Sequence, residues 1–285
     1  ISPLPFSMSG PPSLSGTFLL VGHPNVGKSV LFHRLTGAYV NVSNYPGTTV
    51  EVTRASARFD RESALLDTPG VLALPSRSDD ERTTVRALLN EPTRALLQVG
   101  DAKNLRRTLT LTALLAELRI PLVLALNMHD EAAARGVTID MAALAEALGV
   151  PVEATVATDG QGVGTLAHHL SAARVPRPIL QYDKAIDADI ERVAAAISRH
   201  CPHPRVAARG LAILYLGGDD EVEADGAGLG RDAVDGLLDV TGRDHHQVGQ
   251  LVDHDQNERK PRELPFLAEP RTQLATVEGV VVAAE

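Results

Sequence analysis

The feature that most constrains this chain is the octapeptide GHPNVGKS at residues 22–29, which has the spacing G-x-x-x-x-G-K-S. The apolar run Thr17–Val21 before it predicts a buried strand, and Ser29–Leu35 after it has helical apolar spacing. Between a strand and a helix, such glycines let backbone N–H groups surround phosphates, while Lys28 reaches the β- and γ-phosphate oxygens and Ser29 binds Mg²⁺. The sequence therefore predicts a phosphate-binding P-loop, with nucleotide contacts from Gly22, His23, Pro24, Asn25, Val26, Gly27, Lys28, Ser29 and Val30.

Short apolar runs alternate with amphipathic segments through the first 175 residues, which is typical of a mostly parallel sheet covered by helices on both faces. Together with the P-loop, this pattern predicts an α/β P-loop NTPase fold of three layers. The expected further strands are Glu51–Phe59, Ser63–Leu66, Arg94–Val99, Leu122–Leu126 and Val152–Thr155. The expected helices are Ser29–Leu35 (ended by Gly37), a capped helix from Ser78 to Leu89, Asn104–Leu118 and Asp140–Leu148.

A small α-helical domain is expected after Pro176 and Pro178. Apolar residues recur at helical spacing from Ile186 to Ile197, and further helices are expected near residues 207–216 and 232–240. We therefore divide the chain into residues 1–16, an unstructured tail or a remnant of cloning; 17–175, a nucleotide-binding domain that contains the P-loop; 176–260, a helical accessory domain; and 261–285, a C-terminal tail.

The composition narrows the class of protein. The formal net charge of −9, without a long run of Lys or Arg, argues against nucleic acid as the main partner. The single cysteine, Cys201, excludes an internal disulfide and fits a reducing compartment. No stretch approaches the roughly 18 apolar residues that span a bilayer, and the N-terminus lacks the basic start of a signal peptide. The sequence as given is expected to be soluble and cytoplasmic.

Two segments after the P-loop have the form of nucleotide switches. The tetrapeptide Asp67-Thr68-Pro69-Gly70 follows an apolar run, so that Asp67 can hold Mg²⁺ through water and the Gly70 N–H can contact the γ-phosphate; an ordinary turn is the alternative. In the segment NYPGTTVE at residues 44–51, one threonine hydroxyl is expected to close on Mg²⁺. The register favours Thr49, and Thr48 is the competing choice.

The segment Asn127-Met128-His129-Asp130 ends a predicted strand and has the form of a guanine-reading element in which Met128 replaces a lysine. Asp130 can accept hydrogen bonds from guanine N1–H and N2–H₂, which adenine does not offer. A helix N-cap is the commoner role for an isolated aspartate, but the position after the third strand from the P-loop favours the reading of guanine.

The order of these motifs resembles that of the translation-factor-related GTPases, and among them the ferrous-iron transport proteins of the FeoB type. The similarity covers residues 17 to about 170. The DAKNL run at 101–105 and the methionine in the base-reading motif distinguish the FeoB type from its soluble relatives. The segments that carry it are 22–29, 44–51, 101–105 and ALNMHDEA at 125–132, continued by Gly136, Asp140 and LGVPV at 148–152.

The resemblance implies a last guanine loop with Ser-Ala, where this chain has Val156-Ala157 followed by Thr158. The Ala157 N–H remains available for guanine O6 in this interpretation, but the loop loses a hydroxyl. The polytopic membrane half of the family is also absent, so the chain is either a fragment, held at the cytoplasmic face of the inner membrane by a membrane-embedded iron-transport domain, or a free-standing relative that meets such a domain in trans.

Slow hydrolysis of GTP is expected because Val71 follows Asp67-Thr68-Pro69-Gly70, where Ras-like enzymes have a water-orienting glutamine. The resemblance implies a K⁺ ion held by the P-loop Asn25; an asparagine that satisfies its own loop backbone is the alternative. The expected catalytic residues are Lys28, Asn25, Thr49 and Gly70, and the expected metal ligands are Ser29, Thr49 and Asp67 for Mg²⁺ and Asn25 for K⁺.

Three functions remain open from the sequence: a slow GTPase switch of ferrous-iron transport, a soluble Era- or MnmE-like GTPase of ribosome or tRNA metabolism, and a GTP sensor without turnover. Two groups of metal-ligating residues lack any recognised zinc spacing, and we interpret them as solvated polar faces. They are His200, Cys201 and His203, and Asp244, His245, His246, Asp253, His254 and Asp255.

Overall fold

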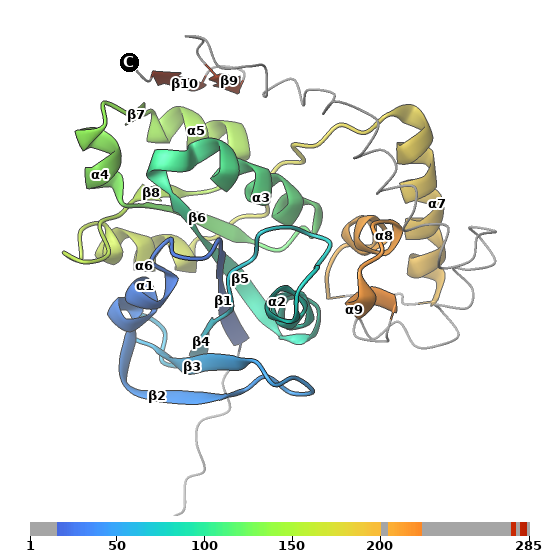
Figure 1. Ribbon diagram of the computed structural model, residues 1–285, viewed down its shortest axis with the longest axis horizontal. Helices are drawn as coiled ribbons and strands as arrows, with labels where there is room; N and C mark the ends of the chain where they lie inside the picture. The colour runs from blue at the N-terminus through green and yellow to red at the C-terminus, as the bar shows by residue number, and fades with distance from the viewer. Residues whose placement is uncertain (1–15, 201–204, 224–274, 278–279, 284–285) are drawn as a thin grey trace, which may run out of the picture.

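The computed structural model describes residues 16–200, 205–223, 275–277 and 280–283. Its main sheet has seven strands in the order β2-β3-β4-β1-β5-β6-β8 (Figure 1). The five strands from β4 to β8 pair in parallel, and β2 and β3 pair antiparallel at one edge. The strands are β1 (Gly16–Gly22), β2 (Thr36–Asn44), β3 (Glu51–Ala57), β4 (Ser63–Asp67), β5 (Thr93–Asp101), β6 (Leu122–Asn127) and β8 (Val152–Ala154).

Both faces of the sheet are covered, because successive side chains of each buried strand enter different hydrophobic clusters. Leu19 and Val21 of β1 pack with the cluster that includes helices α2 (Asp79–Asn90), α3 (Leu105–Glu117) and α5 (Met141–Leu148). Phe18 and Leu20 pack with α1 (Lys28–Leu35) and α6 (Val163–Ser171). The predicted three-layer α/β fold with a mostly parallel sheet is confirmed.

The predicted helix boundaries rest on caps that the structure shows. Ser78 accepts a hydrogen bond from the backbone N–H of Glu81 at the start of α2, and Asp140 accepts one from the N–H of Ala143 at the start of α5. Gly149 ends α5 in the left-handed region, with a φ of 72°. Each cap was readable from the sequence because side chain and spacing specify the end of the helix locally.

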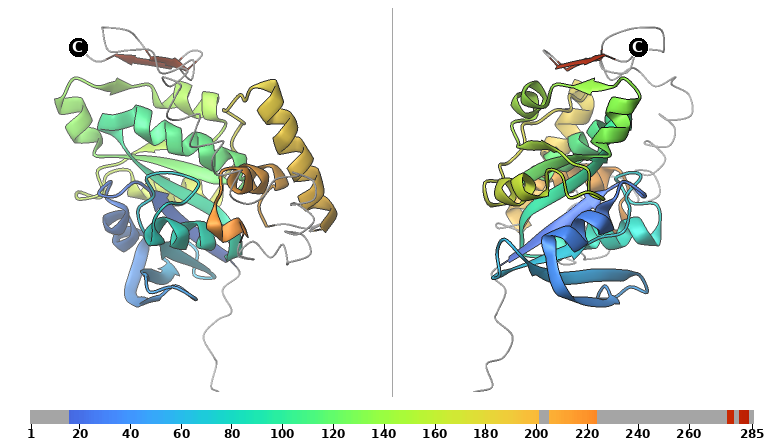
Figure 2. Two further views of the ribbon diagram at one scale, coloured as in Figure 1. Left: turned by 45° about the vertical axis from the view of Figure 1, so that its right-hand side comes forward. Right: turned by 90° about the vertical axis from the view of Figure 1, so that its left-hand side faces the viewer.

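The helical appendage consists of α7 (Lys184–His200), α8 (Ala208–Leu216) and the short α9 (Asp220–Glu223) among the described residues. Figures 1 and 2 place it beside α2 and α3. Ile190 and Val193 of α7 and Leu211 of α8 join the same hydrophobic cluster as α2 and α3. The appendage therefore shares a core with the nucleotide-binding fold, and the boundary near residue 176 stays a prediction. The helix expected at 232–240 lies outside the described residues.

Several elements were not predicted. Strand β2 begins at Thr36, directly after α1, which ends at Leu35 as predicted, and Thr36 rather than Gly37 is the C-cap residue. Strand β3 ends at Ala57 rather than Phe59, because the next residue, Arg58, donates its N–H to Leu35 O at the end of α1 (2.9 Å). Helix α6, the six-residue α4 (His129–Ala134) and a second sheet of β7 (Thr138–Ile139), β10 (Val280–Ala283) and β9 (Ala275–Val277) were also missed. Of these elements, α4, β7, β9 and β10 are too short to give a clear apolar period.

None of the described helices is both long enough and apolar enough to cross a bilayer.

Candidate nucleotide-binding site

The predicted P-loop joins β1 to α1 and is packed too closely for side chains at its glycines. A Cβ at Gly22 would lie 2.2 Å from Val99 O of β5, and one at Gly27 would lie 2.3 Å from Asn127 Nδ2. Gly27 also has a φ of +90°, which places it in the left-handed region as the N-cap of α1. The backbone from 22 to 27 is therefore held directly against the ends of β5 and β6.

Lys28 is buried, with 8% of its surface exposed, although it carries a charge. Its Nζ donates hydrogen bonds to His23 O (3.0 Å) and Gly22 O (3.3 Å), which are carbonyl groups of the P-loop itself. Burial lowers the pKa of Lys28, and the nearby Asp67 carboxylate opposes that shift. An ammonium held in this way is positioned to bind phosphate oxygens at the N-terminus of a helix.

Ser29 and Asp67 meet at the predicted magnesium site. Ser29 Oγ donates a hydrogen bond of 2.7 Å to Asp67 Oδ2, while Asp67 Oδ1 is buried and has no hydrogen-bond partner among the described residues. Burial raises the pKa of Asp67, and the bond from Ser29 and the charges of Lys28 and His33 oppose it. A hydroxyl oxygen beside an unpaired carboxylate oxygen is a donor set that suits Mg²⁺, so the residues fit the expected ion.

The segment that follows β4 lies against the P-loop. A Cβ at Gly70 would approach Pro24 Cγ to 2.6 Å, so glycine is required for this contact. Val71 donates its N–H to Gly22 O (3.0 Å) and its side chain is fully buried in the core. Val71 therefore does not face the phosphate end, whereas the next residue, Leu72, is 59% exposed.

Glu81 of α2 fixes the course of this second switch segment. Its carboxylate accepts hydrogen bonds from the N–H groups of Leu72 (2.8 Å), Ala73 (3.1 Å) and Arg77 (2.8 Å). Burial favours the neutral acid, but these backbone donors outweigh it and lower the pKa of Glu81. One carboxylate thus holds three backbone groups of a loop that has no strand partner.

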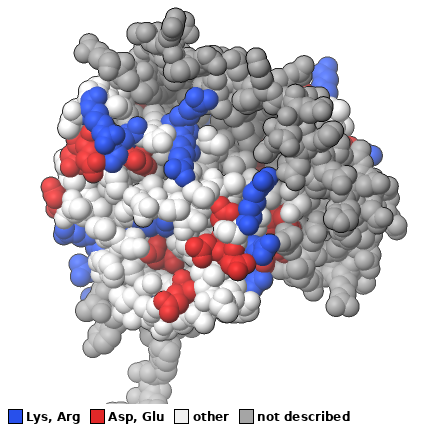
Figure 3. All heavy atoms as spheres, viewed as in Figure 1, with Lys and Arg blue, Asp and Glu red and all other residues white. Residues whose placement is uncertain are grey.

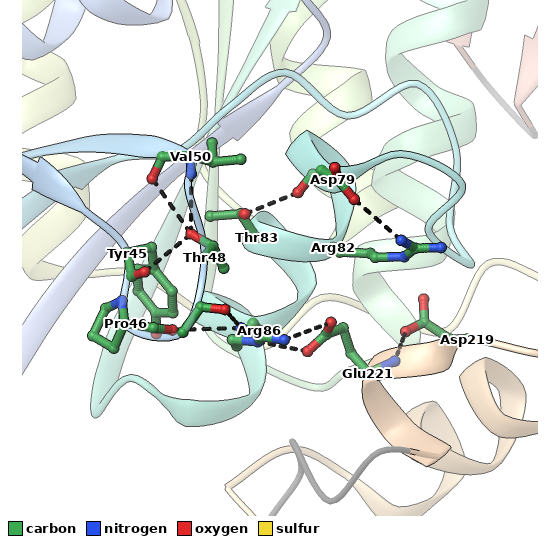
Figure 4. A network of polar contacts seen from close by, with 11 residues as sticks. Tyr45, Pro46, Thr48, Val50, Asp79, Arg82, Thr83, Arg86, Asp219 and Glu221 are labelled. Carbon is green, nitrogen blue, oxygen red and sulfur yellow. Dashed lines mark hydrogen bonds and ion pairs between the residues drawn. The ribbon is translucent and has the colours of Figure 1, made fainter.

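The segment 44–51 forms a turn in which the two threonines differ. Thr48 Oγ1 donates to Tyr45 O (3.0 Å) and accepts from the Val50 N–H (3.3 Å), so its hydroxyl is used by the loop itself (Figure 4). Thr49 is exposed, and its side chain has no hydrogen bond within the described part of the chain. The geometry leaves the Thr49 hydroxyl available, and the choice of Thr49 over Thr48 as the Mg²⁺ ligand stays a prediction.

The same turn is tied to the helical appendage through Arg86 of α2. Arg86 Nη1 donates to Gly47 O (2.8 Å), and its Nε and Nη2 bind the two carboxylate oxygens of Glu221 on α9 at 2.6 and 2.9 Å (Figure 4). The Asp219 carboxylate, in turn, accepts from the N–H groups of Ser76 and Glu221. Nothing in the sequence separates Arg86 from other helix-surface arginines, so sequence reasoning missed it.

At the base end, Asn127 ties three segments together rather than lying open. Its Nδ2 donates to Val26 O of the P-loop (2.9 Å), and its Oδ1 accepts from Thr155 Oγ1 (3.2 Å) and from the Ala157 N–H (3.0 Å). Only 3% of Asn127 is exposed. The Ala157 N–H, expected to be available for guanine O6, is bonded to Asn127 in this structure.

The neighbouring residues of the base-reading element are more open. Asp130 lies in the first turn of α4 and is exposed, as a base-reading carboxylate requires. Met128 adopts a φ of 59°, and Lys103 Nζ lies 3.3 Å from its Sδ and 2.7 Å from Glu131 Oε2. Lys103 belongs to the DAKNL run, which begins at the end of β5. Its ammonium group therefore lies beside Met128, the residue that replaces the lysine of the motif.

The last guanine loop is held from the side of α1. Val156 and Ala157 are buried and Thr158 is exposed. Arg34, in the last turn of α1, donates its Nε to Ala157 O (3.1 Å) and its Nη2 to Thr158 O. The Arg34 contacts were not predicted, because they join residues more than 120 positions apart.

Two P-loop side chains show features that the motif does not specify. Asn25 is exposed, has a φ of 63°, and its amide makes no hydrogen bond to any described residue. The alternative in which Asn25 satisfies its own backbone is not what the structure shows. His23 is buried, and burial, followed by the charges of Arg107 and Lys28, lowers its pKa to about 4.

Charged side chains of both signs are interspersed over the described part of the face in Figure 3. Within the described residues, no group of three or more His, Cys, Asp or Glu is placed to hold a metal ion. The predicted clusters at 200–203 and 244–255 lie, apart from His200, outside the described residues, and their interpretation stays a prediction.

The sequence-family model for the N-terminal part of ferrous iron transport protein B matches residues 16–170 of this chain. This chain belongs to the FeoB family. It is 37% identical over 213 residues to an Fe(2+) transport protein A/Fe(2+) transporter FeoB fusion protein of Porphyromonas gingivalis, covering 71% of this chain and 25% of that protein. It is 42% identical over 155 residues to the Fe(2+) transporter FeoB of Salmonella typhimurium, covering 53% of this chain and 20% of that protein. The chain thus spans about a quarter of the length of such relatives.

Solved FeoB structures share the fold. The cytosolic domain of the T. maritima FeoB iron transporter in its GMPPNP form superposes with a TM-score of 0.65 at 28% identity, covering 84% of this chain and 98% of that one. A point mutant of S. thermophilus NFeoB bound to GDP gives a TM-score of 0.65 at 27% identity, covering 84% and 97%. The resemblance inferred from the motifs is confirmed, and the fold is that of the FeoB P-loop GTPase domain.

Proposed function

We propose that this chain binds GTP, hydrolyses it slowly to GDP and phosphate with Mg²⁺, and acts as the regulatory switch of a ferrous-iron transport system. One observation carries the proposal: Lys28, the Ser29–Asp67 pair and Asn127 converge at the carboxyl ends of β1, β4 and β6. Ligands of open α/β sheets bind at this end of the strands. A nucleoside triphosphate with its Mg²⁺ needs such groups in one line: the Lys28 ammonium for the phosphates, the Ser29 and Asp67 oxygens for the metal ion, and the Asn127 amide on the side of the base.

The proposed chemistry divides among these residues. Lys28 and the N–H groups at the start of α1 bind the β- and γ-phosphates, and the Gly70 N–H meets the γ-phosphate. Ser29, Asp67 and Thr49 hold Mg²⁺, which when bound neutralises the charge that grows on the phosphate oxygens. Asp130 accepts from the guanine N1–H and N2–H₂, while Asn127 fixes the loop that faces guanine O6.

The proposed rate is low because the residue after Gly70 offers no group to orient water. Val71 is buried in the core, and the side chain of Leu72 is apolar. A K⁺ ion bound by the exposed Asn25 amide would supply fixed positive charge beside the P-loop before the reaction begins. The stimulation should be about ten-fold, below the effect of an arginine finger.

The transport role is proposed from the relatives, whose names describe Fe(2+) transporters. We infer that the partner is a membrane-embedded iron-transport domain, in cis or in trans, and that this chain lies at the cytoplasmic face of the inner membrane. The appendage, which contacts the 44–51 turn through Arg86, is the part of the fold best placed to pass the nucleotide state to such a partner.

Hydrolysis assays in K⁺ and Na⁺ buffers of equal ionic strength test this function. We expect GTP to be hydrolysed in preference to ATP, with about ten-fold stimulation by K⁺. Asn25→Ala should lose that stimulation and keep GDP binding, because GDP binding depends on Lys28 and the loop N–H groups. Asn41→Ala, which changes an exposed asparagine of strand β2, is the matched control. Binding without turnover in either salt would identify a GTP sensor instead, and equal rates in both salts would remove K⁺ from the proposal.

A further inference from the structure

The loop that faces the base, residues 155–161, is held from two opposite directions. From the protein interior, Asn127 Oδ1 accepts from Thr155 Oγ1 and from the Ala157 N–H. From α1, the guanidinium of Arg34 donates to Ala157 O and Thr158 O. The two contacts of Arg34 use the planar fork of its side chain, which a single ammonium does not reproduce.

These contacts fix the orientation of two successive peptide groups. In a trans peptide, the C=O and the next N–H point in opposite directions. With Ala157 O turned toward Arg34, the Thr158 N–H points away from α1. With Thr158 O turned the same way, the Asp159 N–H is directed inward, and it does donate to Val156 O (3.1 Å). Arg34 therefore determines which backbone donors the loop presents on its other side.

The loop of this chain depends on such an outside contact. Val156 is buried and apolar, so residue 156 has no hydroxyl that could anchor the loop. The loop also leaves room for the arginine: a Cβ at Gly160 would lie 3.4 Å from Arg34 Nη1, and Gly160 has a φ of +80°. A residue with a Cβ at 160 would be strained by this φ, so glycine keeps the loop in the conformation that Arg34 contacts.

Arg34 also belongs to the helix that binds the phosphates. Lys28 stands in the first turn of α1 and Arg34 in its last turn. Helix α1 packs through Leu31, Phe32 and Leu35 into the core, so it is a fixed support for both ends. A single rigid helix thus sets the distance between the phosphate-binding loop and the base-facing loop.

We propose that Arg34 is a positioning residue for guanine recognition: it holds the 157–159 backbone so that an N–H of this loop meets guanine O6. The inference rests on the proposed function, because it takes a guanine nucleotide as the ligand. Arg34 acts through the loop backbone and does not itself touch the base.

The test compares GDP with 2-aminopurine riboside 5′-diphosphate, which has the same phosphates and 2-amino group but lacks O6 and, with it, the N1–H assigned to Asp130. Each variant is compared with the wild type for the same nucleotide, so the missing N1–H affects both alike. Dissociation constants and dissociation rates are measured for the full chain and for Arg34→Ala, Arg34→Lys and the control Arg58→Ala. Arg58 is an exposed arginine whose N–H bonds Leu35 O at the end of the same helix. We expect Arg34→Ala to weaken GDP binding by about ten-fold, mainly through faster release, and analogue binding by less than about two-fold. Arg34→Lys should recover only part of the loss, and Arg58→Ala should change neither nucleotide.

The ratio of the two affinities separates the possible outcomes. An equal loss for both nucleotides in Arg34→Ala would show a general structural role and overturn the proposal, as would full retention of the GDP preference. If the wild-type chain binds GDP more tightly than the analogue, either result leaves the proposed function intact and rejects only the role of Arg34. If the wild-type chain does not bind GDP, both fail. Where Arg34→Ala does not fold by circular dichroism, Arg34→Lys carries the same comparison, because it keeps the charge and loses the fork.

Discussion

The two halves of the site are built in different ways. At the base half, Asn127 is 3% exposed and bonds the P-loop, Thr155 and Ala157 at the ends of buried strands. At the switch half, the 44–51 turn and the segment after Gly70 are loops with exposed residues, held by the side chains of Arg86 and Glu81. The base half is part of the core, whereas the switch half is attached to it by a few polar contacts. Movement that depends on the nucleotide is therefore expected in the second half.

The largest effect is expected when the side-chain amide of Asn127 is removed from the base half, which tests whether that half is the more rigid one. Asn127→Ala leaves Val26 O, Thr155 Oγ1 and the Ala157 N–H without their partner in a buried position. We expect a loss of about 3 kcal/mol in the free energy of unfolding, measured by urea denaturation, and loss of tight GDP binding. An unchanged midpoint of denaturation would show that the base half is no more rigid than the switch half.

A substitution that leaves the fold intact should next separate recognition from rigidity. Asp130 is exposed and lies on a short helix, so Asp130→Asn should change stability little. It should weaken GTP binding by about 100-fold, because the amide presents a donor where guanine also donates, and it should improve binding of xanthosine nucleotides. Full GTP affinity in the variant, or a wild-type preference for ATP, would contradict the assignment of Asp130.

The attachment of the switch half can be tested at its link to the appendage. Glu221→Gln weakens the bond to Arg86, whose pKa is raised chiefly by the hydrogen bond to that carboxylate. The side chains of Arg86 and Glu221 are 26% and 6% exposed. We therefore expect the free energy of unfolding to fall by about 2 kcal/mol, which is less than for a fully buried ion pair. Hydrogen exchange at the Thr48 and Val50 amides should accelerate, while exchange in β1 stays unchanged. Asp79→Asn, which weakens the exposed pair with Arg82 on the same helix, is the control. Equal effects of the two variants would contradict the link.

The smallest expected effect is a dependence of stability on pH at His23 of the P-loop. Its pKa falls from 6.5 to about 4 on folding, so the unfolded chain binds more protons between these values. The contribution of neutral His23 to the free energy of unfolding is complete above pH 6.5 and is lost as the pH falls toward 4. At pH 5 the loss in the free energy of unfolding amounts to at most about 2 kcal/mol. His23→Asn should flatten the curve of unfolding free energy between pH 7 and 5. An equally steep curve in the variant would assign the dependence to other groups.

Most of the fold could be predicted because the strands and caps are local features of the sequence. The P-loop, the Asp67 position and the Asn127–Asp130 element follow from motifs whose residues share one loop each. The contacts of Arg34, Arg86 and Lys103 could not be predicted, since each depends on how distant segments meet after the sheet forms. Asn127 shows the same limit: its motif indicated the base site, but its three bonds within the protein became visible only in the structure.

The close contact between Gly70 and Pro24 determines where a spectroscopic reporter can be placed. A label at residue 70 would displace the P-loop, since even a Cβ there would lie 2.6 Å from Pro24. Two residues further on, Leu72 is 59% exposed while its N–H remains bonded to Glu81. With the single native thiol replaced by Cys201→Ser, a fluorophore on Leu72→Cys would follow the second switch segment. Its emission would then give a direct optical signal of the bound nucleotide in real time, without a modified nucleotide.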